Sequence, residues 1–259
     1  IRARIARAEA VAGRRRGVRA FGTDDAALVG RWEAPAPMMV SAINAILLPT
    51  GRVLFFANDP VSTGHNAADA WTWDPQTGAW NHVPPPQGPD GRPVDVWCGG
   101  HAFLPDGRLV VAGGNKRFPV GDASPAAGNG YQGLEQVFTF DPFDETWTEQ
   151  PRMRHGRWYP TLTTLSDGRV VILGGLDETG FEGRNTDLEV FTPSRDRHGV
   201  GTLTLQPAAS RRTQIYPHIF TLPGDRVVLA GPNTGDTAVL DTTTWRWSDY
   251  PDVPRNRLW

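Results

Sequence analysis

A segment of similar sequence occurs four times in this chain at nearly regular intervals. Successive copies are 56, 61 and 57 residues apart. Self-similarity with a period of roughly 50 residues is typical of β-propellers, in which each repeat forms one blade. The sequence therefore predicts a repeat architecture built from strands. The four copies are LLPTGRVLFFA at 47–57, FLPDGRLVVAGG at 103–114, TLSDGRVVILGG at 164–175 and TLPGDRVVLAGP at 221–232.

Each copy has the pattern of a β-hairpin. A short apolar run precedes a turn such as Asp106-Gly107, and a run of Val, Ile and Leu such as 170–173 follows the turn. Asp-Gly favours the positive φ angles of a tight hairpin turn, and β-branched residues favour buried strands. We expect a two-residue turn between two strands in each copy.

A second hairpin follows the first in each unit, which gives two hairpins and therefore a four-stranded blade. In three units a Trp follows an Asp after six residues, and we interpret the aspartates as turn formers and the tryptophans as packing between blades. The third unit has a longer, charged loop, 194–199, where the other units have this Trp. The three pairs are Asp74 and Trp80, Asp141 and Trp147, and Asp241 and Trp247.

These patterns predict an all-β fold, a kelch-type β-propeller of which about four blades are present. Residues 26–259 form this partial propeller, with repeats near 30–90, 91–150, 151–208 and 209–255. The abundance of turn formers and large aromatics, 29 Gly, 23 Pro and 10 Trp, agrees with many short strands. Residues 1–25 are rich in Arg, and we expect a linker or a helix there, with a nucleic-acid or membrane arm as the alternative.

Charge and hydropathy exclude several classes of partner. The net charge is −2, so no overall positive field attracts nucleic acid. No apolar run has the length of a transmembrane helix. Cys98 is the one cysteine, so the chain has no internal disulfide. We expect no nucleic-acid partner and no membrane span.

The repeat places four residues at equivalent positions. Cys98, Tyr159 and Tyr216 each lie nine residues before the central turn residue of their copy, and Ala42 has this place in the first copy. We call Ala42, Cys98, Tyr159 and Tyr216 the ring positions. We expect them at the start of the innermost strand of each blade, where side chains converge on the propeller axis. The repeat thus predicts that Cys98 lies beside Tyr159 of the next blade.

Two of these segments resemble motifs of one enzyme family. Trp97-Cys98-Gly99-Gly100-His101 resembles the cysteine-bearing inner strand of the galactose oxidase/glyoxal oxidase-like copper radical oxidases, and RWYPT at 157–161 resembles their tyrosine-bearing strand. The spelling of the second motif is closer to the glyoxal oxidase branch. The resemblance covers about residues 30–255 and implies a seven-bladed ring in the complete protein.

The resemblance also implies a cofactor and site residues. A thioether joins the cysteine to the tyrosine in this family, and the modified tyrosine ligates copper and stores one oxidising equivalent. By resemblance, Cys98 and Tyr159 form this pair and Tyr159 is a copper ligand. We expect Trp97, Trp158, Arg157 and Tyr216 to line the pocket or support the pair. From the residues alone, an inert thiol at Cys98 and packing roles for the two ring tyrosines stay open.

The chain departs from the family pattern in its copper ligands. The family uses a Tyr-His pair on a later inner strand and a further His, but the dipeptide Tyr-His does not occur here. None of the six histidines lies in a matching motif, so the chain supplies at most one copper ligand, Tyr159. Four blades would also leave unpaired edges. We expect the remaining C-terminal blades on the same precursor or on another chain, and we expect this chain alone to be inactive.

Two functional hypotheses follow. In the first, the chain is part of a copper-dependent oxidase that uses O2 to oxidise a primary alcohol or a small aldehyde and releases H2O2. In the second, it is a non-catalytic kelch propeller that binds a protein or a glycan, since a fold does not by itself determine a function. The family resemblance further implies a secreted or cell-surface location.

Overall fold

The structure is a computed structural model that describes Gly30 and residues 37–58, 68–117, 130–180, 183–233 and 236–250. The chain divides into two compact units, Ile1–Pro37 and Met38–Trp259, and all the strands described below belong to the second unit. The linker or helix expected at 1–25 lies outside the described residues. In the described part of the chain, no helix is long and apolar enough to cross a membrane.

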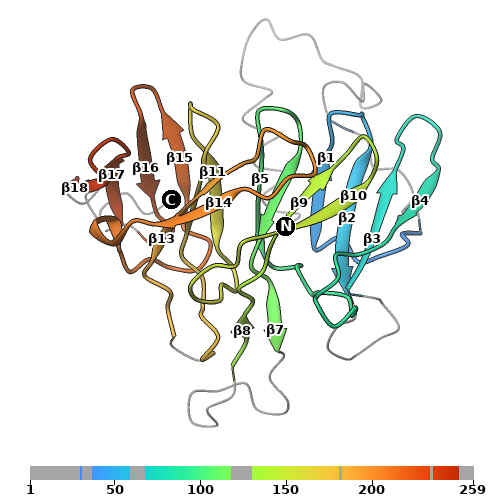
Figure 1. Ribbon diagram of the computed structural model, residues 1–259, viewed down its shortest axis with the longest axis horizontal. Helices are drawn as coiled ribbons and strands as arrows, with labels where there is room; N and C mark the ends of the chain where they lie inside the picture. The colour runs from blue at the N-terminus through green and yellow to red at the C-terminus, as the bar shows by residue number, and fades with distance from the viewer. Residues whose placement is uncertain are drawn as a thin grey trace, which may run out of the picture. The chain divides into compact units, whose positions relative to one another are not determined.

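The second unit contains four antiparallel sheets of four strands each, one for every repeat (Figure 1). These sheets are counted within the described residues, and in each the strands follow one another from the inner to the outer edge. The first sheet comprises β1 (Asn44–Leu47), β2 (Val53–Asn58), β3 (Ala68–Trp73) and β4 (Trp80–Val83), and the second β5 (Gly100–Phe103), β6 (Leu109–Ala112), β9 (Val137–Asp141) and β10 (Thr146–Gln150). The third comprises β11 (Thr161–Thr164), β12 (Val170–Leu173), β13 (Leu188–Thr192) and β14 (Thr202–Leu205), and the fourth β15 (Ile219–Leu222), β16 (Arg226–Ala230), β17 (Thr237–Asp241) and β18 (Arg246–Asp249).

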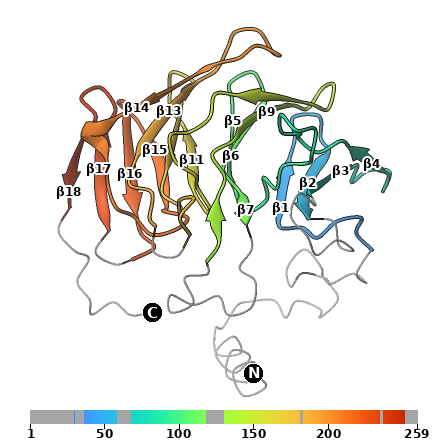
Figure 2. The same cartoon turned by 60° about the horizontal axis from the view of Figure 1, so that its bottom comes forward.

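The inner strands of successive sheets are neighbours in space. β5 lies beside β11, and β11 lies beside β15; Figure 2 shows β15, β11 and β5 near the middle of the view, with β18 and β4 at its two sides. Two further strands, β7 (Asn115–Arg117) and β8 (Gln132–Gly133), pair within the insertion that separates β6 from β9, and a short 3₁₀ helix, η1 (Pro207–Ala209), follows β14. The prediction of a partial β-propeller with four blades is confirmed.

The turn of the inner hairpin differs from the two-residue turn expected from Asp-Gly. In the second blade Leu104 N–H donates to Arg108 C=O at 2.8 Å, so three residues, 105–107, form the loop. Gly107 N–H donates back to Leu104 C=O, and Gly107 has a φ of 86°. This is a type I turn followed by a left-handed residue, and glycine adopts that conformation without a steric cost.

The hydrophobic core lies between neighbouring sheets. Strands β6, β9 and β12 are buried along their whole length. Between the third and fourth blades, Val171 and Leu173 pack in one cluster with Val227 and Leu229. Strands that are covered on both faces read as continuous apolar runs, which explains why the second strand of each hairpin is the most hydrophobic part of the repeat.

The charged loop of the third unit packs against the second blade. The guanidinium group of Arg108, 1% exposed, donates to the carbonyl oxygens of Ser194, Asp196 and Arg197. Arg197 in turn binds the Asp141 carboxylate at 2.6 and 2.8 Å. A polar contact between blades therefore replaces the missing Trp.

The three repeat aspartates form turns, as predicted. The carboxylate of each accepts a hydrogen bond from a backbone N–H two residues further along, as in an Asx turn. The pairs are Asp74 with Gln76, Asp141 with Phe143, and Asp241 with Thr243.

Candidate functional site

The ring positions lie just before the inner strands and not at their first residue. Cys98 precedes β5 by two residues, Tyr159 precedes β11 by two, and Tyr216 precedes β15 by three. The expectation that they are the first residues of these strands is therefore wrong by two or three residues. In the third and fourth blades a proline, Pro160 or Pro217, follows the ring residue. Since proline has no N–H to donate, the ladder begins only after it.

The backbone at three ring positions has an unusual conformation. Cys98, Tyr159 and Tyr216 have φ angles of 60°, 64° and 45°. A non-glycine residue in the left-handed region costs roughly 1–2 kcal/mol, and glycine would remove this cost. Strained residues of this kind concentrate at functional sites. The recurrence at three equivalent places makes these side chains candidates for a functional role.

Hydrogen bonds connect the ring positions from blade to blade. Cys98 N–H donates to the side-chain oxygen Oδ1 of Asn44 in the first blade at 3.1 Å. Tyr159 N–H donates to Cys98 C=O at 3.0 Å, and Tyr216 N–H donates to Tyr159 C=O at 2.7 Å. The backbone thus holds the cysteine segment directly against the tyrosine segment, as the repeat spacing predicted.

The side chains of Cys98 and Tyr159 also interact. Cys98 is 6% exposed and Tyr159 is half-buried. Burial raises the pKa of the Cys98 thiol, although a hydrogen bond with Tyr159 counteracts it. Burial and the hydrogen bond to Cys98 raise the pKa of Tyr159 to about 12. Both groups therefore carry their protons at neutral pH.

Tyr159 lies inside a column of four stacked aromatic rings. Its ring centroid is 3.6 Å from that of Trp158 on one side and 4.3 Å from that of Tyr216 on the other. Trp158 stacks in turn on Tyr131, at 4.3 Å. The three interplanar angles are 12°, 16° and 11°. Trp158 is 8% exposed and Tyr216 is 37% exposed. The column shields both faces of the Tyr159 ring.

The other two expected support residues are buried in the core. Trp97 is 4% exposed and packs in the same cluster as Cys98. Arg157 is fully buried, and its guanidinium group donates to Gly174 C=O, Asp187 C=O and the Glu189 carboxylate at 2.9, 2.8 and 2.9 Å. Arg157 therefore holds the Trp158-Tyr159 segment from behind and does not line an open pocket.

Two residues of this site, Tyr131 and Asn44, were not predicted from the repeat pattern. Tyr131 comes from the insertion between β6 and β9, and Asn44 belongs to the first inner strand. Asn44 lies two residues after the ring position Ala42, and it is 6% exposed. In the sequence it is only a polar residue at the start of an expected strand, and nothing predicts that its amide is buried. Nothing in the sequence relates Tyr131 to Trp158.

The described residues do not make up a copper site around Tyr159. Within them, one group of three His, Cys, Asp or Glu side chains has its ligand atoms within 4.8 Å of one another, namely Asp141, Asp144 and His198. This group lies at the opposite end of the sheets from the ring positions, and Arg197 already neutralises Asp141. Tyr159 is thus the single copper ligand that the resemblance assigns to this chain, and a complete set needs further residues.

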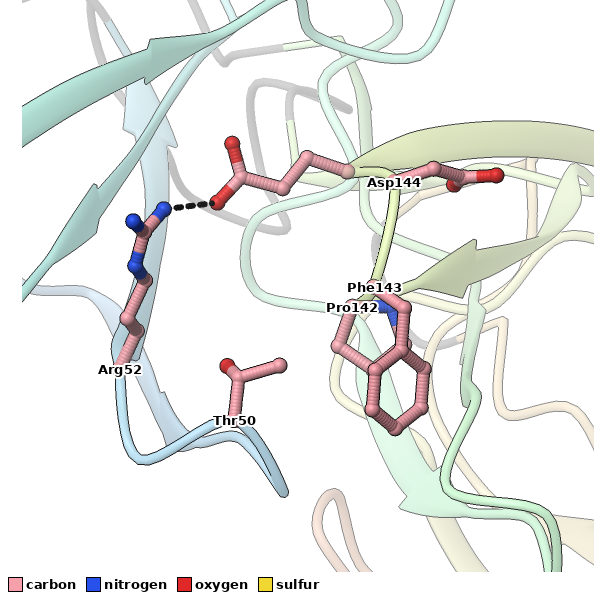
Figure 3. A pocket seen from close by; sticks show the side chains of 6 residues that line it. Thr50, Arg52, Pro142, Phe143 and Asp144 are labelled. Carbon is pink, nitrogen blue, oxygen red and sulfur yellow. Dashed lines mark hydrogen bonds and ion pairs between the residues drawn. The ribbon is translucent and has the colours of Figure 1, made fainter.

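A pocket lies between the first two blades. Its volume is about 450 Å³, and Thr50 and Arg52 line it from the β1–β2 turn opposite residues 142–145 of the β9–β10 turn. An ion pair between Arg52 and Glu145, 3.0 Å long, crosses it (Figure 3). Since both turns follow the ends of their strands, the pocket lies at the end of the blades away from Cys98, and we assign no role to it.

The fold and the site together define a class: a partial β-propeller with a cysteine and a tyrosine held together at its ring positions. Comparison with solved structures agrees. A fungal alcohol oxidase of the AA5 family, solved in complex with copper, superposes with a TM-score of 0.61 at 19% identity, over 88% of this chain and 45% of that chain. At this identity the likeness establishes the fold.

Sequence comparisons relate the chain to named oxidases. It is 28% identical over 223 residues to a galactose oxidase of Gibberella zeae and 26% identical over 174 residues to an aldehyde oxidase of Vitis pseudoreticulata. It is also 27% identical over 206 residues to a WSC domain-containing protein of Arthroderma benhamiae. No protein-family model matches. The resemblance to the galactose oxidase/glyoxal oxidase-like copper radical oxidases is confirmed.

The alignments cover most of this chain but little of its relatives. They include 80%, 63% and 76% of the chain for the galactose oxidase, the aldehyde oxidase and the WSC domain-containing protein. The chain spans 29%, 28% and 20% of the length of these three relatives.

Proposed function

We propose that this chain is part of a copper radical oxidase that oxidises a primary alcohol or a small aldehyde with O2 through a Cys98–Tyr159 thioether. The observation that carries the proposal is the contact between these two residues, whose backbones share a hydrogen bond of 3.0 Å and whose side chains also interact. The relatives, a galactose oxidase and an aldehyde oxidase, support the substrate class.

The geometry is compatible with formation of the thioether. The side chains of Cys98 and Tyr159 interact, and the ring carbon ortho to the Tyr159 hydroxyl is the atom to which sulfur would bind. Bond formation breaks the S–H and the C–H bond and releases two protons and two electrons. One O2 takes them up and leaves as H2O2. A sulfur substituent donates electron density to the phenol and makes it easier to oxidise than ordinary tyrosine.

Copper would supply the second one-electron store that a two-electron oxidation needs. Cu(II) prefers imidazole and oxygen ligands, and this chain offers it Tyr159. We propose that the other ligands come from further blades, on the same precursor or on another chain, that complete the ring with residues 26–259. A secreted or cell-surface location belongs to the same proposal.

Exposed apolar side chains on the first and fourth blades support the proposal that further blades pack against them. Leu47 on β1 is 66% exposed and Phe220 on β15 is 58% exposed. On the inner strands of the two middle blades, the exposed large apolar side chain is Phe103, which is 37% exposed. Uncovered apolar residues on both terminal sheets are expected where further blades of the ring would pack.

The test is a mass measurement on the full-length protein after exposure to copper and air. A thioether lowers the mass by two hydrogens, protects Cys98 from alkylation after reduction, and joins the Cys98 peptide to the Tyr159 peptide. Cys98→Ser abolishes the joined peptide, whereas the control Tyr250→Phe, at an exposed tyrosine outside the site, leaves it unchanged. A fully alkylatable Cys98 in the copper-loaded protein contradicts the cofactor and favours the scaffold hypothesis.

Activity is tested separately. The copper-loaded full-length protein should consume O2 and release H2O2 in equal amounts with members of a panel of primary alcohols and aldehydes. Absence of O2 consumption with the whole panel would overturn the oxidase proposal even where the thioether is present.

A further inference from the structure

The column of stacked rings extends well beyond the pair that the proposed function needs. It contains three of the four tyrosines of the chain, Tyr131, Tyr159 and Tyr216, with Trp158 between the first two. The rings come from the insertion, from the entry to β11 and from the entry to β15. The fourth tyrosine, Tyr250, lies at the end of β18, is 54% exposed and is not part of the column.

The spacing is that of rings in van der Waals contact. Centroids 3.6 to 4.3 Å apart with interplanar angles of 16° or less bring neighbouring π systems together over most of their area. Edge-to-face pairs are as common as stacked pairs in proteins, so three consecutive stacked contacts are a specific arrangement. Tyrosine and tryptophan are among the most easily oxidised side chains, and electron transfer between rings in contact is fast.

The rings of the column differ in exposure, and a tyrosine lies at each end. Trp158 is 8% exposed, and Tyr159 is half-buried between two rings. Tyr216 is 37% exposed at one end, and Tyr131 is half-buried at the other. An electron lost from the middle of the column can therefore be replaced from either of two outer phenols.

We propose that the column is a redox relay, through which an oxidising equivalent on Tyr159 passes to Tyr131 by way of Trp158 and to Tyr216 by direct contact. Such a relay moves a misplaced radical away from the cysteine–tyrosine pair to outer tyrosines. Its biological use rests on the proposed function, because it presupposes that Tyr159 is oxidised, but the electron transfer itself requires neither copper nor the thioether.

Each step balances. A one-electron oxidant takes an electron from a tyrosine phenol, and the phenol proton goes to water. The resulting Tyr159 radical takes an electron from Trp158 and a proton from water, which restores its O–H bond. The Trp158 radical cation then takes an electron from Tyr131, whose phenol proton goes to water. The net change is movement of one radical from Tyr159 to Tyr131.

The experiment applies hexachloroiridate(IV), a bulky one-electron oxidant, to the copper-free full-length protein in the presence of a nitroso spin trap. All samples carry Cys98→Ser, so that neither a thiol nor a thioether captures the radical. Trap adducts at each tyrosine are then quantified by peptide mapping. Within the column the oxidant reaches Tyr216, 37% exposed, most easily, so adducts at Tyr131 report transfer along the column.

Trp158→Phe keeps an aromatic ring in the column but removes the oxidisable step. We expect a several-fold loss of adduct at Tyr131, a gain at Tyr216 and no change at Tyr250. Tyr216→Phe, which removes the entry point, should also lower the adduct at Tyr131. Trp147→Phe is the matched control: it removes a Trp that packs on Phe56 and Phe140 outside the column, and it should change none of these yields.

Adduct at Tyr131 that is the same in Trp158→Phe as in the parent would overturn the relay, as would an equal loss in Trp147→Phe. Near-ultraviolet circular dichroism checks that each variant is folded, and if Trp158→Phe is not, Tyr216→Phe alone decides between relay and direct oxidation. If no transfer to Tyr131 is found but protein that keeps Cys98 forms the thioether, the relay is wrong and the proposed function stands. If transfer is found but the thioether does not form, the relay stands and the proposed function is wrong.

Discussion

The backbone N–H of Tyr159 donates a hydrogen bond of 3.0 Å to the carbonyl oxygen of Cys98. This bond joins two blades at equivalent places of the repeat, and the next bond in the series joins Tyr216 to Tyr159 at 2.7 Å. Because backbone atoms make this connection, it does not involve the side chains of Cys98 and Tyr159. These two side chains can therefore be changed without removing the hydrogen bond.

Replacement of Tyr159 by Phe should abolish the thioether and leave the fold intact. The ring still stacks on Trp158, but the phenol that directs oxidation is gone, so Cys98 should become fully alkylatable. The lost hydrogen bond between the two side chains should cost about 1 kcal/mol. Alkylation and urea unfolding measure the two effects. A joined peptide in Tyr159→Phe would contradict the assignment of Tyr159.

The raised pKa of Tyr159 predicts a stability change at alkaline pH. Burial and the hydrogen bond to Cys98 bring the pKa to about 12 in the folded protein, against a value of about 10 in the unfolded chain. A raised pKa means that the folded state holds the proton more tightly. This contribution to stability is complete below pH 10 and is lost between about pH 10 and pH 12.

The measurement is urea unfolding at a series of alkaline pH values in the protein without the cross-link. Wild type should lose more stability than Tyr159→Phe over the stated window. Equal slopes for the two proteins would show that Tyr159 titrates as in the unfolded chain. Tyr250→Phe is the control, since Tyr250 is 54% exposed and lies outside the column.

Replacement of Arg157 by Met should destabilise the protein by about 3–5 kcal/mol, because it leaves the buried Glu189 carboxylate without its charged partner. Glu189 is 3% exposed. The double variant Arg157→Met/Glu189→Leu removes both charges and should be more stable than the single variant. Urea unfolding measures both, and a double variant no more stable than Arg157→Met would contradict a dominant role of the ion pair.

The double variant Arg157→Met/Glu189→Leu also tests whether Arg157 positions the ring of Tyr159. Arg157 anchors the segment that carries Trp158 and Tyr159 to Gly174 and Asp187. If it positions the ring, the double variant should form the thioether more slowly at a temperature where it is fully folded. An unchanged rate of cross-linking would mean that Arg157 contributes to stability alone.

Two glycine substitutions separate backbone conformation from blade packing. Gly51 and Gly113 have φ angles of 81° and 74°. A Cβ on Gly51 meets nothing within 4 Å, whereas a Cβ on Gly113 would overlap the carbonyl oxygen of Arg157. Gly51→Ala should cost about 1 kcal/mol from the left-handed conformation alone.

Gly113→Ala should cost clearly more, since it also pushes the Arg157 segment away from the second blade. Thermal unfolding of the two variants provides the comparison, and accessibility of Cys98 to alkylation is a second measure that only Gly113→Ala should increase. Equal losses of stability would mean that the contact between the two segments adjusts without cost.

Much of this architecture follows from local patterns. Alternating turns and apolar runs determine the strands because a hairpin is formed by residues close in sequence, and the interval between copies sets the size of a blade. The pairing of Cys98 with Tyr159 followed from spacing alone, since equivalent positions in successive repeats become neighbours. The turn length was mispredicted because Asp-Gly also suits a three-residue loop.

Other features depend on contacts between distant segments. Arg157 is the first residue of the tyrosine motif and was expected to line the pocket or support the pair, but its ion pair with Glu189 on β13 joins it to a residue outside the motif. The loop at 194–199 was visible only as a charged insertion, and its contact with Arg108 is formed between blades.

The sequence by itself thus determined the repeat, the four-stranded blades and the meeting of Cys98 with Tyr159, because each depends on order and spacing along the chain. Only the tertiary structure decided that Tyr131 extends the stack of rings on Tyr159 and that Glu189 is the charge that holds Arg157. Those contacts join residues far apart in sequence, among them Tyr131 from an insertion that the repeat does not govern, and side-chain packing between blades has no periodic signal along the chain.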